Sequence, residues 1–195
     1  MRVRDENKKA TIFENAMEMI VADGFDGLSM QKLARAANVS PATIYIYFKS
    51  REDLLNQLFN GAHHTFSQVA LHGFDPSMSF EEGLWLQWKK RLRFIIKYPV
   101  HFNFCEQFIN CGKINHCDIK MAEYKEAMQE FLKNAIKRGE MKKMEPELFW
   151  SMAYGPFYSL VKFHLQQKSI TDTKFKLTDA KMKLVFNMVI KAFTP

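Results

Sequence analysis

The chain has 195 residues, of which 47% are hydrophobic and 25% charged, and its formal net charge is +7. This length suits one large domain or two small ones. No run approaches the roughly 18 apolar residues that a membrane-spanning helix needs, and the N-terminus is polar where a signal peptide would be apolar. We therefore expect a cytoplasmic protein with no membrane partner.

The net charge alone does not indicate nucleic-acid binding. Residues 1–60 contain eight Lys or Arg and eight Asp or Glu, so the basic excess lies after residue 60. Contact with DNA must depend on placement, and the tail Arg2-Val3-Arg4 and the pair Lys49 and Arg51 are suitably placed cations. The later basic run from Lys89 to Arg93 is interpreted as a solvated helix face, with attraction of an anionic ligand as the alternative.

Start and stop signals for two short helices fall within a dozen residues. Ser29 is a suitable N-cap for a helix over about 29–36. Asn38 tolerates the left-handed conformation that a short turn requires. Ser40 then caps a second helix, with Pro41 at its first position, where the missing amide costs nothing.

Two helices joined by so short a turn must cross steeply. This arrangement places the second helix in the major groove of DNA, with its N-terminal residues against the base edges. An ordinary helical hairpin in a bundle core is the alternative. A core helix would not carry Thr43, Tyr45 and Tyr47 on its exposed side, so the pattern favours a helix-turn-helix.

The opening third of the chain resembles the TetR family of bacterial regulators. The resemblance is carried by a long first helix from Lys9 to Ala22, by the segment Gly24-Phe25-Asp26-Gly27-Leu28-Ser29 and by the run Tyr45-Ile46-Tyr47-Phe48-Lys49-Ser50-Arg51-Glu52-Asp53-Leu54-Leu55. The remaining two thirds are similar to the family only in helical layout. The resemblance implies an all-α homodimer that binds a near-palindromic operator and releases it when a small molecule enters the C-terminal domain.

The resemblance also implies which residues contact operator DNA. Gln31 stands where family members often reach a base, and Lys49 matches a phosphate contact. Arg51 replaces a common lysine, and Ala42 offers only a methyl group, which suits contact with a thymine methyl. The expected DNA-binding residues are Ser29, Met30, Gln31, Ser40, Pro41, Ala42, Thr43, Tyr45, Tyr47, Lys49 and Arg51.

We expect an all-α fold of about nine helices in two domains. Residues 1–49 form the helix-turn-helix domain and residues 50–195 a helical effector-binding and dimerisation domain, and a helix from about 51 to 71 links them. Later helices are indicated by the stripe from Phe80 to Ile95, by Pro99, and by Gly139, which ends a seventh helix. The last two run to about Gln167 and Phe193.

Aromatic residues and methionines are unusually frequent, with 18 Phe, 12 Met and 3 Trp. Most of them are read as core. As a set, those on helices that the family folds around an effector cavity suit a hydrophobic, aromatic, lipid-like or drug-like ligand. The expected ligand-binding residues are Trp85, Trp88, Phe102, Phe104, Phe108, Tyr124, Met128, Phe131 and Tyr154. A bend at Gly155-Pro156 would free the carbonyl of Met152, either as a polar handle for a ligand or as a packing kink.

The last two helices are apolar on two sides, which indicates a bundle shared by two subunits. Leu184 and Met188 add apolar surface beside the main stripe of the final helix. A monomer with a fully buried terminal helix is the alternative. The expected dimer interface contains Phe149, Phe157, Met182, Val185, Phe186, Val189 and Phe193.

No pattern predicts a metal site, a cofactor or a catalytic centre. Cys105, Cys111 and Cys117 are six residues apart, unlike the short spacing of zinc ligands, so buried thiols are favoured over metal or redox sensing. No phosphate loop, His-Glu-x-x-His or nucleophile elbow occurs, and we expect no enzyme. The predicted function is a ligand-responsive repressor. The alternative is an architectural DNA-binding protein controlled by a protein partner.

Overall fold

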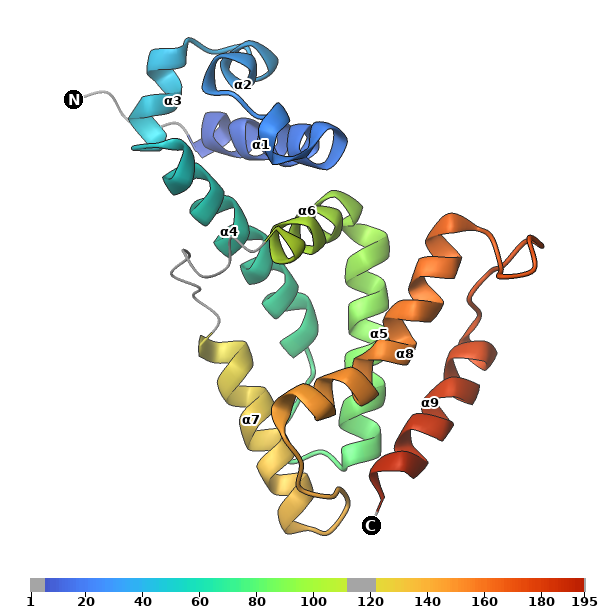
Figure 1. Ribbon diagram of the computed structural model, residues 1–195. Helices are drawn as coiled ribbons and strands as arrows, with labels where there is room; N and C mark the ends of the chain where they lie inside the picture. The colour runs from blue at the N-terminus through green and yellow to red at the C-terminus, as the bar shows by residue number, and fades with distance from the viewer. Residues whose placement is uncertain (1–5, 112–121, 195) are drawn as a thin grey trace. The chain divides into compact units, whose positions relative to one another are not determined.

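A computed structural model describes residues 6–111 and 122–194 (Figure 1). These residues form nine α-helices and no β-strand, which confirms the expected all-α fold. The helices are α1 (Glu6–Gly27), α2 (Met30–Ala36), α3 (Pro41–Tyr47), α4 (Arg51–Leu71), α5 (Phe80–Lys97), α6 (Pro99–Asn110), α7 (Ala122–Lys137), α8 (Pro146–Gln166) and α9 (Asp179–Phe193). No helix in the described ranges is long and apolar enough to cross a membrane. The N-terminal Arg2-Val3-Arg4 and Cys117 lie outside the described residues.

The chain divides into two compact units. The first unit comprises residues 1–68 and 94–121, and the second comprises residues 69–93 and 122–195. Helices α1, α2, α3 and α6 belong to the first unit, and α7, α8 and α9 to the second. Helices α4 and α5 contribute residues to both units.

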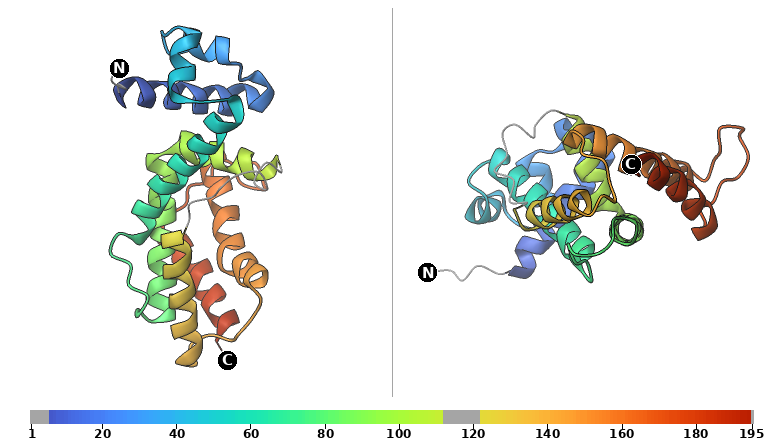
Figure 2. Two further views of the ribbon diagram at one scale, coloured as in Figure 1. Left: turned by 90° about the vertical axis from the view of Figure 1, so that its left-hand side faces the viewer. Right: turned by 90° about the horizontal axis from the view of Figure 1, so that it is seen from below.

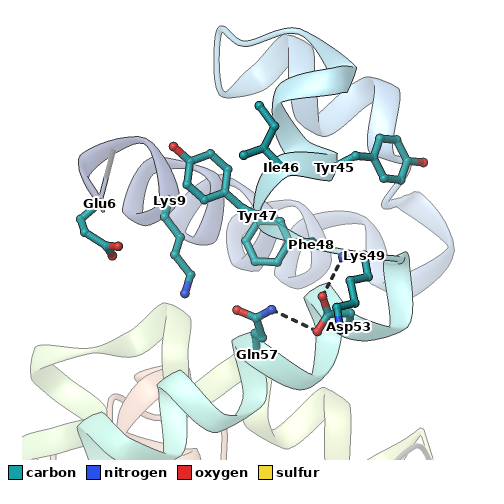
Figure 3. Close-up of a pocket in the computed structure, with 9 residues that line it drawn as sticks. All are labelled: Glu6, Lys9, Tyr45, Ile46, Tyr47, Phe48, Lys49, Asp53 and Gln57. Atoms are coloured by element: carbon teal, nitrogen blue, oxygen red, sulfur yellow. Dashed lines mark hydrogen bonds between the residues drawn. The ribbon is translucent and has the colours of Figure 1, made fainter. Parts of the chain in front are cut away.

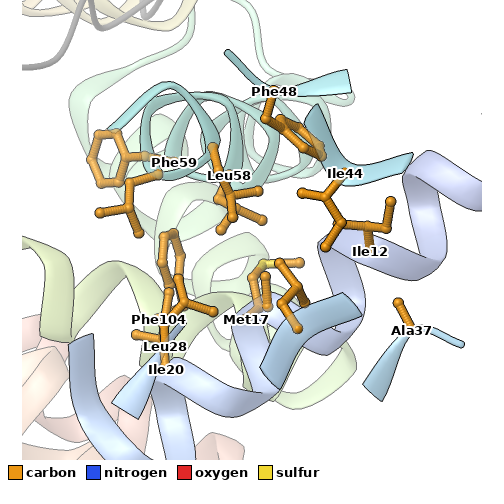
Figure 4. Packing of buried hydrophobic residues seen from close by; sticks show 14 of the residues in the cluster. Ile12, Met17, Ile20, Leu28, Ala37, Ile44, Phe48, Leu58, Phe59 and Phe104 are labelled. Carbon is orange, nitrogen blue, oxygen red and sulfur yellow. The ribbon is translucent and has the colours of Figure 1, made fainter. Parts of the chain in front are cut away.

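The first unit is held together by a cluster of hydrophobic side chains from α1, α2, α3, α4 and α6 (Figure 4). Ile12, Ile20, Ile44, Phe48 and Leu58 are fully buried in it. Burial of one such side chain contributes about 1.5–3 kcal/mol. The apolar spacing of α3 buries Ile44 and Tyr47 and so fixes this short helix in the cluster.

Helix α6 is part of the core of the first unit. The Phe108 ring stacks on Phe59 with centroids 4.4 Å apart and meets the edge of Phe25 at 5.8 Å. The Gln107 amide Nε2 donates a 3.1 Å hydrogen bond to the Val21 carbonyl of α1. Phe104, which is also fully buried, belongs to the same cluster.

The core of the second unit is built on aromatic side chains. The Trp88 indole donates a 2.9 Å hydrogen bond to the Ala153 carbonyl, and its ring lies 5.3 Å from Phe157 and 5.2 Å from Phe186. Helices α8 and α9 lie side by side (Figures 1 and 2). Helix α7 ends at Lys137, two residues before Gly139, whose φ of 73° is left-handed, close to the expected end.

Most residues of the expected dimer interface are buried within the single chain. Phe149, Phe157, Met182, Phe186, Val189 and Phe193 are at most 7% exposed, and Val185 is partly exposed. These side chains form the seam between α8, α9 and the rest of the second unit. The apolar side chains that α8 and α9 leave exposed are different ones, namely Leu148, Trp150, Met152, Leu165, Leu184 and Met188.

The expected ligand residues fall into two groups. Phe102, Phe104 and Phe108 belong to the first unit, where Phe104 and Phe108 are core residues. Trp85, Trp88, Tyr124, Met128, Phe131 and Tyr154 belong to the second unit, and all but the partly exposed Trp85 are buried there. Helix α8 runs through Pro156, and nothing lies within 4 Å of a Cβ built on the exposed Gly155.

Candidate DNA-binding site

Side-chain caps define both helices of the turn. The Ser29 hydroxyl accepts a 3.1 Å hydrogen bond from the Lys32 amide, and the Ser40 hydroxyl accepts one of 3.1 Å from the Thr43 amide. Each bond satisfies an amide that the first turn of a helix leaves without a partner. The two predicted N-caps are confirmed, as is Pro41 at the start of α3.

The turn between α2 and α3 depends on Asn38. Its φ is 53°, in the left-handed region that asparagine tolerates better than most residues. The chain then reverses, and the Val39 amide donates a 2.9 Å hydrogen bond to the Ala34 carbonyl. This closed turn holds the start of α3 in one orientation relative to α2.

Helix α3 presents a short exposed surface. Pro41, Ala42 and Tyr45 are exposed, Tyr45 by 55%, whereas Ile44 is fully buried. We call seven exposed residues among those expected to bind DNA the candidate DNA-binding surface: Ser29, Gln31, Ser40, Pro41, Ala42, Tyr45 and Lys49. Thr43 is half-buried beside them, and its hydroxyl is hydrogen-bonded to the Ser40 hydroxyl at 2.9 Å.

Three of the expected DNA contacts are engaged inside the protein. Tyr47 is only 9% exposed and lies beside Phe48, and Met30 packs against the hydrophobic cluster. The Arg51 guanidinium donates a hydrogen bond to the Phe25 carbonyl, which joins the start of α4 to the end of α1. Through these contacts Tyr47, Met30 and Arg51 hold the helices that carry the candidate DNA-binding surface.

Asp53 braces the junction between α3 and α4. Its carboxylate accepts a 2.7 Å hydrogen bond from the Lys49 amide and one of 3.0 Å from the Gln57 side chain (Figure 3). The Ser50 hydroxyl accepts from the Asp53 amide at 3.1 Å and so caps α4. The hydrogen bond from Gln57, followed by that from the Lys49 amide, lowers the pKa of Asp53. An ionised Asp53 therefore fixes the backbone that carries Lys49.

A hollow of about 320 Å³ lies next to this junction (Figure 3). It is lined by Glu6, Lys9, Tyr45, Ile46, Tyr47, Phe48, Lys49, Asp53 and Gln57. The Lys9 ammonium, 5.5 Å from the Phe13 ring centroid, adds a second cation near Lys49. Lys9, Asp53 and Gln57 were not among the expected site residues, because only the fold brings these residues of α1 and α4 to the end of α3.

Comparisons with known proteins agree with this geometry. Residues 12–58 match the family model of bacterial regulatory proteins of the tetR family. An uncharacterized HTH-type transcriptional regulator of Haemophilus influenzae is 29% identical over 124 residues, which cover 60% of this chain and 66% of the relative.

Solved structures share the fold along nearly the whole chain. A TetR family transcription regulator of Marinobacter aquaeolei is 28% identical with a TM-score of 0.75, and the match covers 99% of this chain and 98% of that one. The Bacillus subtilis transcriptional regulator FadR, solved in complex with stearoyl-CoA, is 21% identical with a TM-score of 0.63, covering 95% and 99%. The capped helix-turn-helix and these matches together show that residues 12–58 form a DNA-binding domain of the tetR family of bacterial regulatory proteins.

Proposed function

We propose that this chain is a cytoplasmic repressor that leaves a palindromic operator when a hydrophobic or aromatic small molecule binds. The observation that carries the DNA-binding part is the exposed start of α3, with Tyr45 55% exposed above the fully buried Ile44. A recognition helix needs this combination, because its outer side chains must reach base edges while its inner side is fixed.

Residues 1–49 supply the DNA-binding domain in this proposal and residues 50–195 the effector-binding and dimerisation domain. Ser29, Gln31 and Ser40 position the protein on phosphates and bases, and Lys49 neutralises a phosphate. Two copies of the domain are required, since a palindromic operator presents half-sites in major grooves about 34–36 Å apart.

The homodimer forms, in this proposal, through the exposed apolar side chains of α8 and α9. Leu184 and Met188, one turn apart on α9, are 59% and 62% exposed, and Leu148 and Met152 repeat the pattern on α8 at 55% and 39%. Exposed apolar side chains at helical spacing are typical of protein–protein interfaces. Leu184→Lys combined with Met188→Lys should convert a dimer into a monomer in analytical ultracentrifugation. An unchanged sedimentation coefficient would place the interface elsewhere.

The effector is proposed to contact the second unit. Trp85, Tyr124, Met128 and Tyr154 supply apolar walls with hydroxyl groups, a lining that suits a hydrophobic ligand. The complex of Bacillus subtilis FadR with stearoyl-CoA supports a ligand that contains a long apolar chain.

Release then follows from a population shift. Operator DNA favours the dimer conformation in which the distance between the two recognition helices matches the spacing of successive major grooves. The effector favours a second conformation with a different distance. The effector must bind the second arrangement more tightly, because equal affinity shifts nothing. A coupling of about 1.4 kcal/mol changes operator affinity tenfold.

The test is binding of the purified protein to DNA from upstream of its own gene, titrated with salt and then with a panel of hydrophobic compounds. Sequence-specific binding that weakens steeply with salt, and that one compound relieves, supports the proposal. Specific binding that no compound disturbs shifts weight to a DNA-binding protein controlled by a protein partner. Equal affinity for random DNA contradicts the proposal.

A further inference from the structure

The hollow beside the end of α3 brings together two cations from distant parts of the chain. Lys9 lies near the start of α1 and Lys49 follows α3, and both line this hollow of about 320 Å³. In Figure 3 their side chains lie on opposite sides of Gln57. Tyr45, a residue of the candidate DNA-binding surface that is 55% exposed, lines the same hollow. The hollow therefore adjoins the surface that is proposed to face DNA.

Two stacked aromatic rings position both lysines. The Lys9 ammonium lies 5.5 Å from the ring centroid of Phe13, one turn later on α1. Phe13 in turn stacks on Phe48, with centroids 5.5 Å apart. Phe48 is fully buried, forms the C-cap of α3 and directly precedes Lys49 in the chain. The same pair of rings therefore places the Lys9 ammonium and the backbone of Lys49.

Two carboxylates also line the hollow. The Oδ2 atom of Asp53 accepts from the Lys49 amide and its Oδ1 atom from the Gln57 side chain, so both oxygens already hold the junction of α3 and α4. The hydrogen bond from Gln57 is the main cause that lowers the pKa of Asp53, and the charges of Lys49 and Lys9 contribute to the same shift. Both ammonium groups are therefore within electrostatic reach of one carboxylate. The second carboxylate belongs to Glu6, which is exposed at the start of α1.

The two lysines are available to an external anion. Neither takes part in an ion pair within the described part of the chain. Lys49 is exposed and Lys9 is half-buried, with its stem against the ring of Phe13. Such an arrangement keeps the charged end of a lysine accessible while its stem is covered.

We infer that Lys9 contacts the DNA backbone together with Lys49, each ammonium group neutralising one phosphate at this hollow. The inference rests on the proposed function and deepens its DNA-binding part, because it adds α1 to an interface otherwise made by α2, α3 and the residue that follows α3. Phosphate contacts fix the register and orientation of a protein on the duplex without reading its sequence. Two cations on different segments therefore orient α3 better than Lys49 does alone.

The experiment measures binding of the full chain to upstream DNA and to a random duplex at several salt concentrations, by fluorescence anisotropy. Lys9→Met removes the charge and keeps an apolar stem against Phe13. It should reduce the slope of log affinity against log salt by about 0.9 for each copy in the complex. The reduction should occur on both duplexes, because every sequence presents the same phosphates. Lys9→Arg keeps the charge and should keep the slope.

Lys97→Met is the matched control. Lys97 also belongs to the first unit, and its ammonium lies 5.1 Å from the ring centroid of Tyr98. The control therefore loses the same charge and the same kind of ring contact. Lys97 lines a different hollow, together with Tyr98 and His101, so its loss should leave the slope unchanged. Circular dichroism checks that both variants melt like the wild type.

Two further variants test the hollow by other means. Glu6→Gln removes a negative charge from the lining and leaves Lys9 in place, so it should raise the affinity for both duplexes. Lys9→Met combined with Lys49→Ala should reduce the slope by about 1.8 for each copy, since two separate phosphates lose their cations.

Three results would overturn the Lys9 contact: a change of slope no larger than that of Lys97→Met, a combined variant that behaves like Lys49→Ala alone, or no gain in affinity from Glu6→Gln. The two duplexes separate this inference from the proposed function. Sequence-specific binding with a slope that ignores Lys9→Met would leave the repressor proposal standing and remove the contact. A slope that depends on Lys9, in a protein with no preference for upstream DNA, would do the reverse.

Discussion

The two compact units treat their interiors differently. The hydrophobic cluster of the first unit, from Ile12 to Phe108, contains no charged side chain. In the second unit, the polar Gln87 and the charged Arg91 are 0% and 3% exposed, and the hydroxyl groups of Tyr124 and Tyr154 are buried in the same unit. In the first unit, polar side chains lie in helix caps and on the exposed surface. In the second unit, a cation, Arg91, is buried.

This difference corresponds to two kinds of binding. A surface that reads DNA must project side chains from a rigid support, and an apolar interior provides that support at low cost. A site for a small molecule gains selectivity from polar groups held in an apolar enclosure, since a buried donor left without its acceptor penalises the wrong ligand. The predictions below test whether the two units behave as this contrast requires.

The largest effect is expected from Phe48→Ala. Phe48 is fully buried and stacks on Phe13 with centroids 5.5 Å apart, so its truncation should cost about 3–5 kcal/mol of stability. DNA binding should be lost, and circular dichroism should show an earlier thermal transition. Tryptophan emission, which reports only on the second unit, should change at a higher temperature. Coincident transitions would show that the two units unfold together.

Ile46→Ala is the control for this change. Ile46 is two residues before Phe48 and 40% exposed, so its truncation should alter stability by about 0.5 kcal/mol or less.

Tyr45→Ala tests the exposed surface rather than its support. Because Tyr45 is 55% exposed, the variant should fold like the wild type and lose about 1–3 kcal/mol of specific DNA binding. Titration of upstream DNA by fluorescence anisotropy measures the loss. Unchanged affinity would remove Tyr45 from the candidate DNA-binding surface.

The helix-turn-helix was predictable because its determinants are local. Ser29, Asn38 and Ser40 act on residues within four positions of themselves, so the residue types alone fix the caps and the turn. Tyr47 shows the limit. Both the residue pattern and the family resemblance placed it on the exposed, DNA-facing side of α3, whereas the structure buries it beside Ile44, three residues earlier on the same side of the helix.

Interior positions of the second unit were harder to predict, because a charged residue is ordinarily expected at the surface. Positions 84, 87, 88, 91 and 95 form one buried stripe of α5, yet Arg91 was assigned to a solvated face with its lysine neighbours. Helix α9 shows a related ambiguity. Both of its faces are apolar, and periodicity cannot tell which of them packs inside the chain. From the sequence alone, the side with Phe186 was assigned to a partner subunit. In the single chain this side is buried, and Met188 on the other side is exposed.

Lys49→Ala tests whether the exposed lysine of the first unit contacts a DNA phosphate. Lys49 is exposed next to α3, and the loss of one phosphate contact should reduce the slope of log affinity against log salt by about 0.9 for each copy in the complex. Lys191→Ala removes an equally exposed lysine of the second unit and should leave the slope unchanged. Equal slopes for the two variants would mean that Lys49 does not contact phosphate.

The smallest effect is expected from Asp53→Asn. Hydrogen bonds from Gln57 and the Lys49 amide lower the pKa of Asp53 below its ordinary 3.8, so the folded state favours the ionised carboxylate. This contribution is complete above about pH 4 and disappears as pH falls through the lowered pKa. Wild type should therefore melt slightly above the variant at pH 7, and the difference should vanish in strong acid. A difference that persists at pH 2 would show that the charge of Asp53 does not brace the junction between α3 and α4.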